Sequence, residues 1–62
     1  MDKRTQYLYM LEHHKEKREI WERKNLDYFK GNMTEVEEEI YLSNLNYLNK
    51  KIAYYNKKLK EM

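Results

Sequence analysis

An apolar or aromatic side chain recurs every three or four residues through the second half of this chain. Because an α-helix has about 3.6 residues per turn, such a spacing places these side chains on one side of a helix. Further apolar residues, Val36, Ile40, Tyr47 and Tyr54, widen that side beyond the seam of a two-stranded coiled coil. The pattern predicts a long amphipathic helix that needs a partner surface. Its central stripe consists of Tyr41, Leu45, Leu48, Ile52, Tyr55, Leu59 and Met62.

The places where helices can end are few in this sequence. The chain of 62 residues has no proline and a single glycine, Gly31, which suits the left-handed conformation that ends a helix. Thr34 followed by Glu37 is the pattern of a capping box, which opens the next helix. We therefore predict one all-α domain over residues 1–62, an antiparallel two-helix hairpin. Its helices span about 2–30 and about 35–60, and its turn spans 31–34.

The expected first helix is apolar at both ends but polar in the middle, where it offers His14, Lys17 and Arg18. In a hairpin these residues would lie opposite Leu45 and Leu48, and burying an unpaired cation costs several kcal/mol. We therefore predict that a second copy completes the apolar stripe and that the homodimer is a four-helix bundle. The predicted dimer seam consists of Tyr41, Leu45, Leu48, Ile52, Tyr55 and Leu59.

Charges nearly balance over the whole chain but not along it. Thirteen Lys and Arg against eleven Asp and Glu leave a net charge of +2, which does not by itself point to nucleic acid. Glutamates gather in residues 35–39 and lysines in residues 50–60. An antiparallel pair of second helices would bring these opposite charges together, so this orientation of the dimer is favoured.

The compartment is predicted from what the sequence omits. There is no cysteine, which excludes a disulfide framework and thiolate zinc sites and fits a reducing compartment. No apolar run approaches the roughly 20 residues of a membrane span, and the first residues lack the pattern of a signal peptide. We expect a cytoplasmic protein with no membrane partner. The abundance of Lys, Asn, Tyr and Ile is typical of AT-rich coding and favours a bacterial or phage source.

Residue patterns for catalysis or metal binding are weak. His13 and His14 point about 100° apart on a helix and cannot converge on one ion. The glutamates of residues 35–39 complement the helix dipole. Ser43 has no histidine near it in sequence, and the chain has no glycine-rich phosphate loop. We therefore predict no enzyme activity, no cofactor and no metal.

The remaining hypothesis is binding of a macromolecule. His14, Lys17, Arg18 and Trp21 form the candidate partner-binding set, because a tryptophan flanked by cations resembles the anchors of protein interfaces. The alternative role for Trp21 is a core residue packed on Ile40 and Tyr41. The predicted function is a small regulatory or inhibitory module that binds a larger host protein.

A nucleic-acid-binding bundle, similar in architecture to plasmid copy-control proteins, is the second hypothesis. The seven tyrosines with Trp21 could stack on bases, and basic residues at the open end of the hairpin could contact phosphates. These basic residues are Lys3, Arg4, Lys57, Lys58 and Lys60.

A third hypothesis comes from the run Ser43-Asn44-Leu45-Asn46. The chain resembles the small bacterial two-helix aspartyl-phosphate phosphatases of the sporulation phosphorelay in its length and its expected hairpin. The similarity in sequence covers about residues 34–56 and includes this run. That family carries a Ser-Gln-Glu-Leu-Asp motif on its second helix. The run here is one residue shorter and has an asparagine where the family has its essential aspartate. The resemblance implies a phosphatase-like regulator that lacks the carboxylate on which the activity depends.

Overall fold

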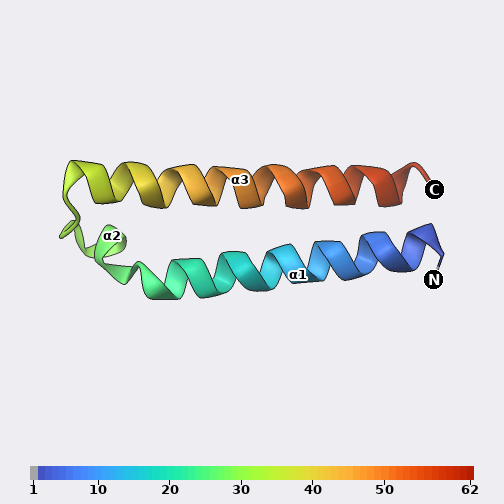
Figure 1. The fold of residues 1–62 in the computed structure, drawn as a ribbon, viewed down its shortest axis with the longest axis horizontal. Helices are drawn as coiled ribbons and strands as arrows, with labels where there is room; N and C mark the ends of the chain where they lie inside the picture. Colours follow the sequence, from blue (N-terminus) through green and yellow to red (C-terminus); the bar gives the residue numbers. More distant parts are fainter. Residues whose placement is uncertain (1) are drawn as a thin grey trace.

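The computed structural model describes residues 2–62, and all of its regular structure is helical. Helix α1 spans Lys3–Lys24, α2 spans Leu26–Lys30 and α3 spans Glu35–Lys60. The two long helices, α1 and α3, pack along each other and run in opposite directions, so the start of α1 and the end of α3 lie at the same end of the molecule (Figure 1). The prediction of an all-α chain is confirmed.

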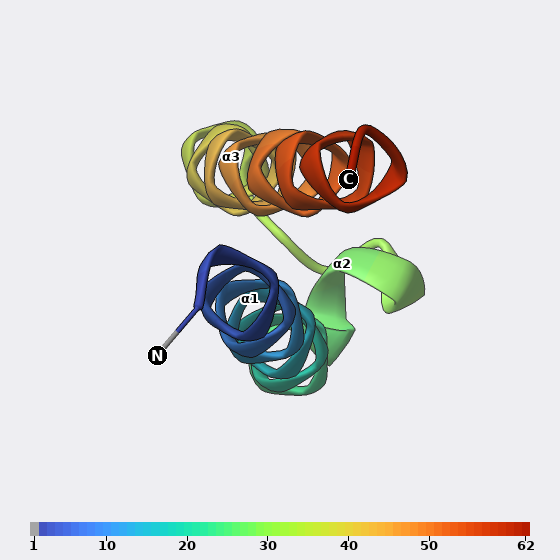
Figure 2. The same cartoon turned by 90° about the vertical axis from the view of Figure 1, so that its right-hand side faces the viewer.

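The first half of the chain differs from the prediction of one helix to residue 30, because α1 ends at Lys24. Asn25 leaves the helical conformation (φ −122°, ψ 40°), and its side-chain amide donates to the carbonyl of Trp21 at 2.7 Å. Asparagine competes in this way for backbone groups and is a poor residue for a helix interior. The chain then restarts as α2, which lies to the side of α1 when the molecule is viewed from its open end (Figure 2).

The turn into α3 has the predicted geometry. Gly31 is left-handed, with φ 71°, and its amide donates to the carbonyl of Tyr28. The amide of Asn32 donates to the carbonyl of Asp27, which completes a Schellman motif at the end of α2.

The predicted capping box at the start of α3 is confirmed. The amide of Glu37 donates to Oγ1 of Thr34 at 3.2 Å, and the amide of Thr34 donates to Oε1 of Glu37 at 3.2 Å. At the start of α1, Asp2 accepts from the amide of Thr5 at 2.7 Å. This hydrogen bond lowers the pKa of the Asp2 carboxyl below its ordinary value.

The core is small and lies between α1 and α3. Tyr41, 1% exposed, is its largest fully buried side chain, and its ring packs against Trp21, Tyr28 and Phe29 with centroids 6.1, 4.6 and 6.4 Å away. The break at Asn25 thus places the aromatic residues of α2 on Tyr41. The buried apolar residues of the described chain are Leu11, Tyr41, Leu48 and Ile52.

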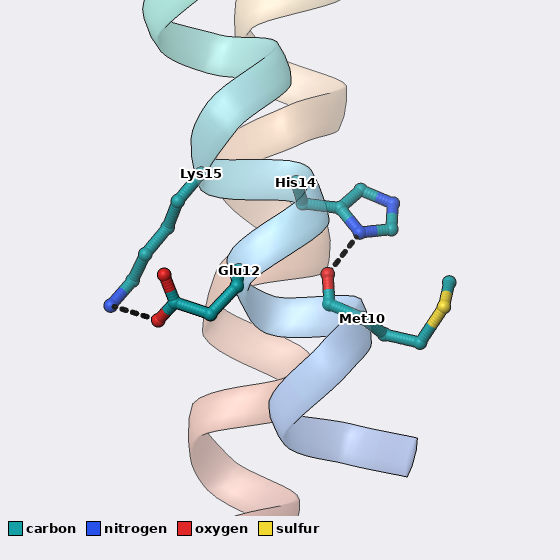
Figure 3. A network of polar contacts seen from close by, with 4 residues as sticks. All are labelled: Met10, Glu12, His14 and Lys15. Atoms are coloured by element: carbon teal, nitrogen blue, oxygen red, sulfur yellow. Dashed lines mark hydrogen bonds and ion pairs between the residues drawn. The ribbon is translucent and has the colours of Figure 1, made fainter. Parts of the chain in front are cut away.

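The polar residues in the middle of α1 pack against α3 through hydrogen bonds that were not predicted from the sequence. His14 is buried, 7% exposed, with its Nδ1–H donating to the carbonyl of Met10 at 2.7 Å (Figure 3). Its ring lies 5.5 Å from that of Tyr55, while Arg18 donates from Nη1 to Oδ1 of Asn49 at 2.9 Å. Hydrogen-bonded polar groups can be buried at little cost. The lysine between them, Lys17, is exposed.

The predicted seam residues therefore pack within a single chain. Tyr41, Leu48 and Ile52 are buried against α1, and Leu45, Tyr55 and Leu59 are half-buried. In the single chain α1 covers the middle of this stripe, where His14 is buried with a hydrogen bond to its own helix and Arg18 donates to Asn49. The predicted dimer seam stays a prediction, and the apolar side chains that α3 leaves exposed lie outside this stripe.

Candidate functional site

A groove of about 350 Å³ lies between α1 and α3 on one side of the molecule. The α1 residues that line the groove are three or four positions apart, about one helical turn. The α3 residues that line it are the buried Leu48 and its neighbours on α3. Helical spacing explains the set, since residues three and four apart share a face. The groove is lined by Lys17, Ile20, Trp21 and Lys24 from α1 and by Asn44, Tyr47 and Leu48 from α3.

Trp21 is held in place where the two helices meet. Its Nε1–H donates to the backbone carbonyl of Tyr41 at 3.1 Å, and its ring stacks on that of Tyr41 at an angle of 14°. Only one other side-chain hydrogen bond joins α1 to α3 within residues 2–62, the pair Arg18 and Asn49. Trp21 is thus half-buried, packed on the core residue Tyr41, and also lines the groove, while its role as an anchor for a partner stays a prediction.

The apolar surface continues along α3 beyond the groove. Ile40 and Tyr47 are 54% and 56% exposed, and Tyr54 lies two turns after Tyr47 on the same face. We call the groove and this continuation the groove face. Exposed apolar residues gathered on one side of a small protein commonly mark an interaction surface. The groove face consists of Lys17, Ile20, Trp21, Lys24, Val36, Ile40, Asn44, Tyr47, Lys51, Tyr54 and Lys58.

Charge is distributed unevenly over the groove face. No acidic side chain is among the described residues that line the groove. Toward the open end of the molecule, two lysines lie over tyrosine rings. The amino group of Lys51 lies 5.8 Å from the ring centroid of Tyr47, and the amino group of Lys58 lies 5.6 Å from the ring centroid of Tyr54. The opposite end of α3 is acidic, with three glutamates in its first turn. The groove face itself therefore carries only cations, Lys17, Lys24, Lys51 and Lys58, whereas the glutamates at the start of α3 lie outside it.

The four residues predicted to bind a partner do not share one surface. Lys17 and Trp21 line the groove, whereas His14 is in the core and Arg18 points to Asn49. A partner cannot reach the His14 ring while α1 and α3 remain packed.

Sequence reasoning missed four groove residues, Ile20, Lys24, Asn44 and Tyr47, as members of a common site. The signal available for α1 was the spacing of Lys17, Ile20, Trp21 and Lys24, which is that of one helix face. That signal could not show which face of α3 would lie beside it.

Other patterns singled out in the sequence are not assembled into a site. The rings of His13 and His14 are 5.8 Å apart and nearly perpendicular. Within residues 2–62, no three His, Cys, Asp or Glu side chains come together in a way that could hold a metal ion. Ser43, Asn44 and Asn46 are exposed on α3.

The ion pairs of the described chain are local and exposed. Glu12 with Lys15, at 3.9 Å, lies on the side of α1 away from the His14 ring (Figure 3). Arg23 with Glu19 and Lys58 with Glu61 also join residues of the same chain segment. Such pairs contribute little to stability and leave the specificity of the fold to the core.

No helix in the described part of the chain carries an apolar stretch long enough to span a bilayer.

Comparison with protein-family models, with curated proteins and with solved structures gave no match to this chain.

Proposed function

We propose that this chain is a small, non-enzymatic protein-binding module that regulates or inhibits a larger protein through the faces of its helices. The observation that carries the proposal is the groove face, on which Ile20, Ile40 and Tyr47 are each more than half exposed. Side chains of this kind are stabilised by removal from water, at about 25 cal/mol per Å² of apolar surface. The fixed ring of Trp21 adds the type of anchor that dominates many protein interfaces.

Self-association is the second part of this proposal: two hairpins form a homodimeric four-helix bundle, and the larger protein competes with the second copy for the exposed helix faces. The small size of the core supports it, because residues 2–62 bury few apolar side chains completely. A chain this short is marginally stable unless a disulfide, a metal or a second chain adds to its core. There is no cysteine to supply a disulfide.

Capture of the larger protein from the native host tests the first part. We would immobilise the wild type and two double variants of equal charge change, Lys17→Glu with Lys24→Glu and Lys15→Glu with Arg23→Glu. The first pair alters the groove, and the second alters exposed residues that do not line it. Lysates would be treated with nuclease, and the helicity of each variant would be measured first.

The proposal predicts one nuclease-resistant protein that the wild type and the Lys15/Arg23 variant retain in similar yield and the groove variant loses. Equal retention by all three chains would contradict a role for the groove face. Loss of every captured protein after nuclease treatment would contradict a protein partner.

A nucleic-acid-binding bundle remains the second candidate, because cations and aromatic rings alternate along α3. Lys51 lies over Tyr47 and Lys58 over Tyr54, and such pairs can contact phosphates while the rings stack on bases. Gel shifts with single-stranded RNA and with duplex DNA at rising salt test it. A salt-sensitive shift that Lys51→Ala with Lys58→Ala abolishes would favour this candidate, and no shift at any salt concentration would dismiss it.

A further inference from the structure

We infer that the groove face binds a second copy of this chain, with the two α3 helices antiparallel and Tyr47 close to the twofold axis. This inference rests on the self-association proposed above and specifies its surface and orientation. The stripe of α3 that was predicted as the seam is covered by α1, so the contact has to use another side of α3. On the groove face, the exposed Val36, Ile40, Tyr47 and Tyr54 of α3 lie in line with the groove.

The opposite charges at the two ends of α3, rather than charge on the groove face itself, favour a second copy as the occupant. The start of α3 is acidic, with Glu35, Glu37 and Glu38 in its first turn, and its last turn carries Lys57, Lys58 and Lys60. A second α3 laid antiparallel on the first brings each acidic start against a basic end. A parallel pair would stack like charges at both ends, which costs free energy.

The start of α1 adds positive charge at this end, because α1 begins with Lys3 and Arg4. Figure 1 shows that the start of α1 lies beside the end of α3. The acidic groups nearby are already engaged: Asp2 accepts from the Thr5 amide, and Glu61 lies 3.8 Å from Lys58. The open end of the molecule therefore presents a surplus of positive charge to an acidic helix start.

The spacing of the apolar residues fits the same arrangement. Ile40 lies seven residues before Tyr47, and Tyr54 lies seven residues after it, which is about two turns in each direction. An antiparallel pair centred on Tyr47 places Ile40 of each copy against Tyr54 of the other. Tyr47 then meets its own copy, and each α3 lies along the groove whose floor includes Trp21 and Leu48.

Single-cysteine variants test this arrangement cleanly, because the chain contains no cysteine of its own. The variants are Tyr47→Cys, Ile40→Cys and Tyr54→Cys on the groove face, with Asn46→Cys as the matched control. Asn46 is exposed on α3 and points away from both α1 and the groove face. All four replaced side chains are exposed, so each variant should keep its helicity, which circular dichroism checks.

After mild oxidation, Tyr47→Cys should give at least about fivefold more disulfide-linked dimer than Asn46→Cys, since a disulfide needs Cα atoms within about 7 Å. Ile40→Cys and Tyr54→Cys should each link poorly alone. An equimolar mixture of the two should link efficiently, and only as the mixed dimer.

Two results would overturn the inference. If sedimentation of the reduced wild type shows a dimer but Ile40→Cys and Tyr54→Cys link to themselves as well as Tyr47→Cys does, the groove face is in contact but the helices are parallel, so the inferred antiparallel orientation is wrong. If the wild type sediments as a monomer, the self-association itself is wrong and the inference fails with it.

Discussion

In Tyr41, the ring and the hydroxyl have opposite effects on the stability of the fold. Its ring is the centre of the aromatic core, yet its hydroxyl is buried and has no hydrogen-bond partner within residues 2–62. Leaving a buried polar group unsatisfied costs about 1 to 3 kcal/mol. The ring therefore stabilises the fold while its hydroxyl destabilises it.

Removing that hydroxyl should stabilise the protein. We expect Tyr41→Phe to raise the free energy of unfolding by about 1 kcal/mol, because the ring contacts remain and the unsatisfied group is lost. Urea denaturation of the variant, beside Tyr47→Phe as an exposed control, measures this change. A loss of stability in Tyr41→Phe would mean that the hydroxyl has a partner in solution.

The same residue should make the fold sensitive to alkali. Burial, with a smaller effect of the Glu22 carboxylate, raises the pKa of Tyr41 above its ordinary value of 10.0. The unfolded chain then loses this proton first, so the contribution of Tyr41 to stability is complete below pH 10 and falls as pH rises through the folded-state pKa. Tyr41→Phe should resist this loss.

Unfolding of the wild type and of Tyr41→Phe at pH 8 and at pH 10.5 measures the effect. The stability gap between the two proteins should widen at the higher pH. A gap that stays constant would show that Tyr41 ionises alike in the folded and unfolded chains.

Among the elements, the turn between α2 and α3 depends on one backbone conformation. Gly31 has φ 71°, and a methyl group added there would meet no atom within 4 Å. The cost of Gly31→Ala should therefore come from the left-handed backbone alone, at about 1 to 2 kcal/mol. Gly31→Asn should cost less, because asparagine tolerates this conformation better. Thermal melting of the two variants compares them, and an equal loss would point to a steric cause.

The elements also show where prediction from the sequence succeeds. The bounds of α3 and the turn follow from local signals, the capping box of Thr34 with Glu37 and the glycine at 31, and both are present as expected. The break at Asn25 could not be predicted in this way. One asparagine in a helix has a modest cost, and the break gains from a distant contact, the packing of Tyr28 on Tyr41.

The candidate site was less accessible to sequence reasoning. Helical spacing correctly groups Lys17 with Trp21. The sequence alone also predicted that His14 and Arg18 would be unpaired cations opposite the apolar stripe of α3. In the structure the His14 ring donates to a carbonyl of its own helix and Arg18 reaches Asn49 on the other. These partners depend on the rotation of α1 about its axis, which no local signal fixes.

At the scale of the whole molecule, substitutions at two adjacent residues of α3 should distinguish folding of the single chain from association of two chains. Leu48 is buried between the helices, 7% exposed, whereas Tyr47 lies on the groove face. A glutamate at position 48 would bury a charge in the core and should unfold the chain, with loss of its helical signal in circular dichroism. A glutamate at position 47 stays in water in the single chain and should weaken only the contact with a second copy.

Sedimentation equilibrium of the wild type beside Tyr47→Glu, at tens of micromolar, shows whether two chains associate through the groove face. We expect twice the mass of the chain for the wild type and the mass of a single chain for Tyr47→Glu, with Leu48→Glu unfolded in the same buffer. A compact wild-type monomer, or a Tyr47→Glu variant that remains fully dimeric, would contradict this association.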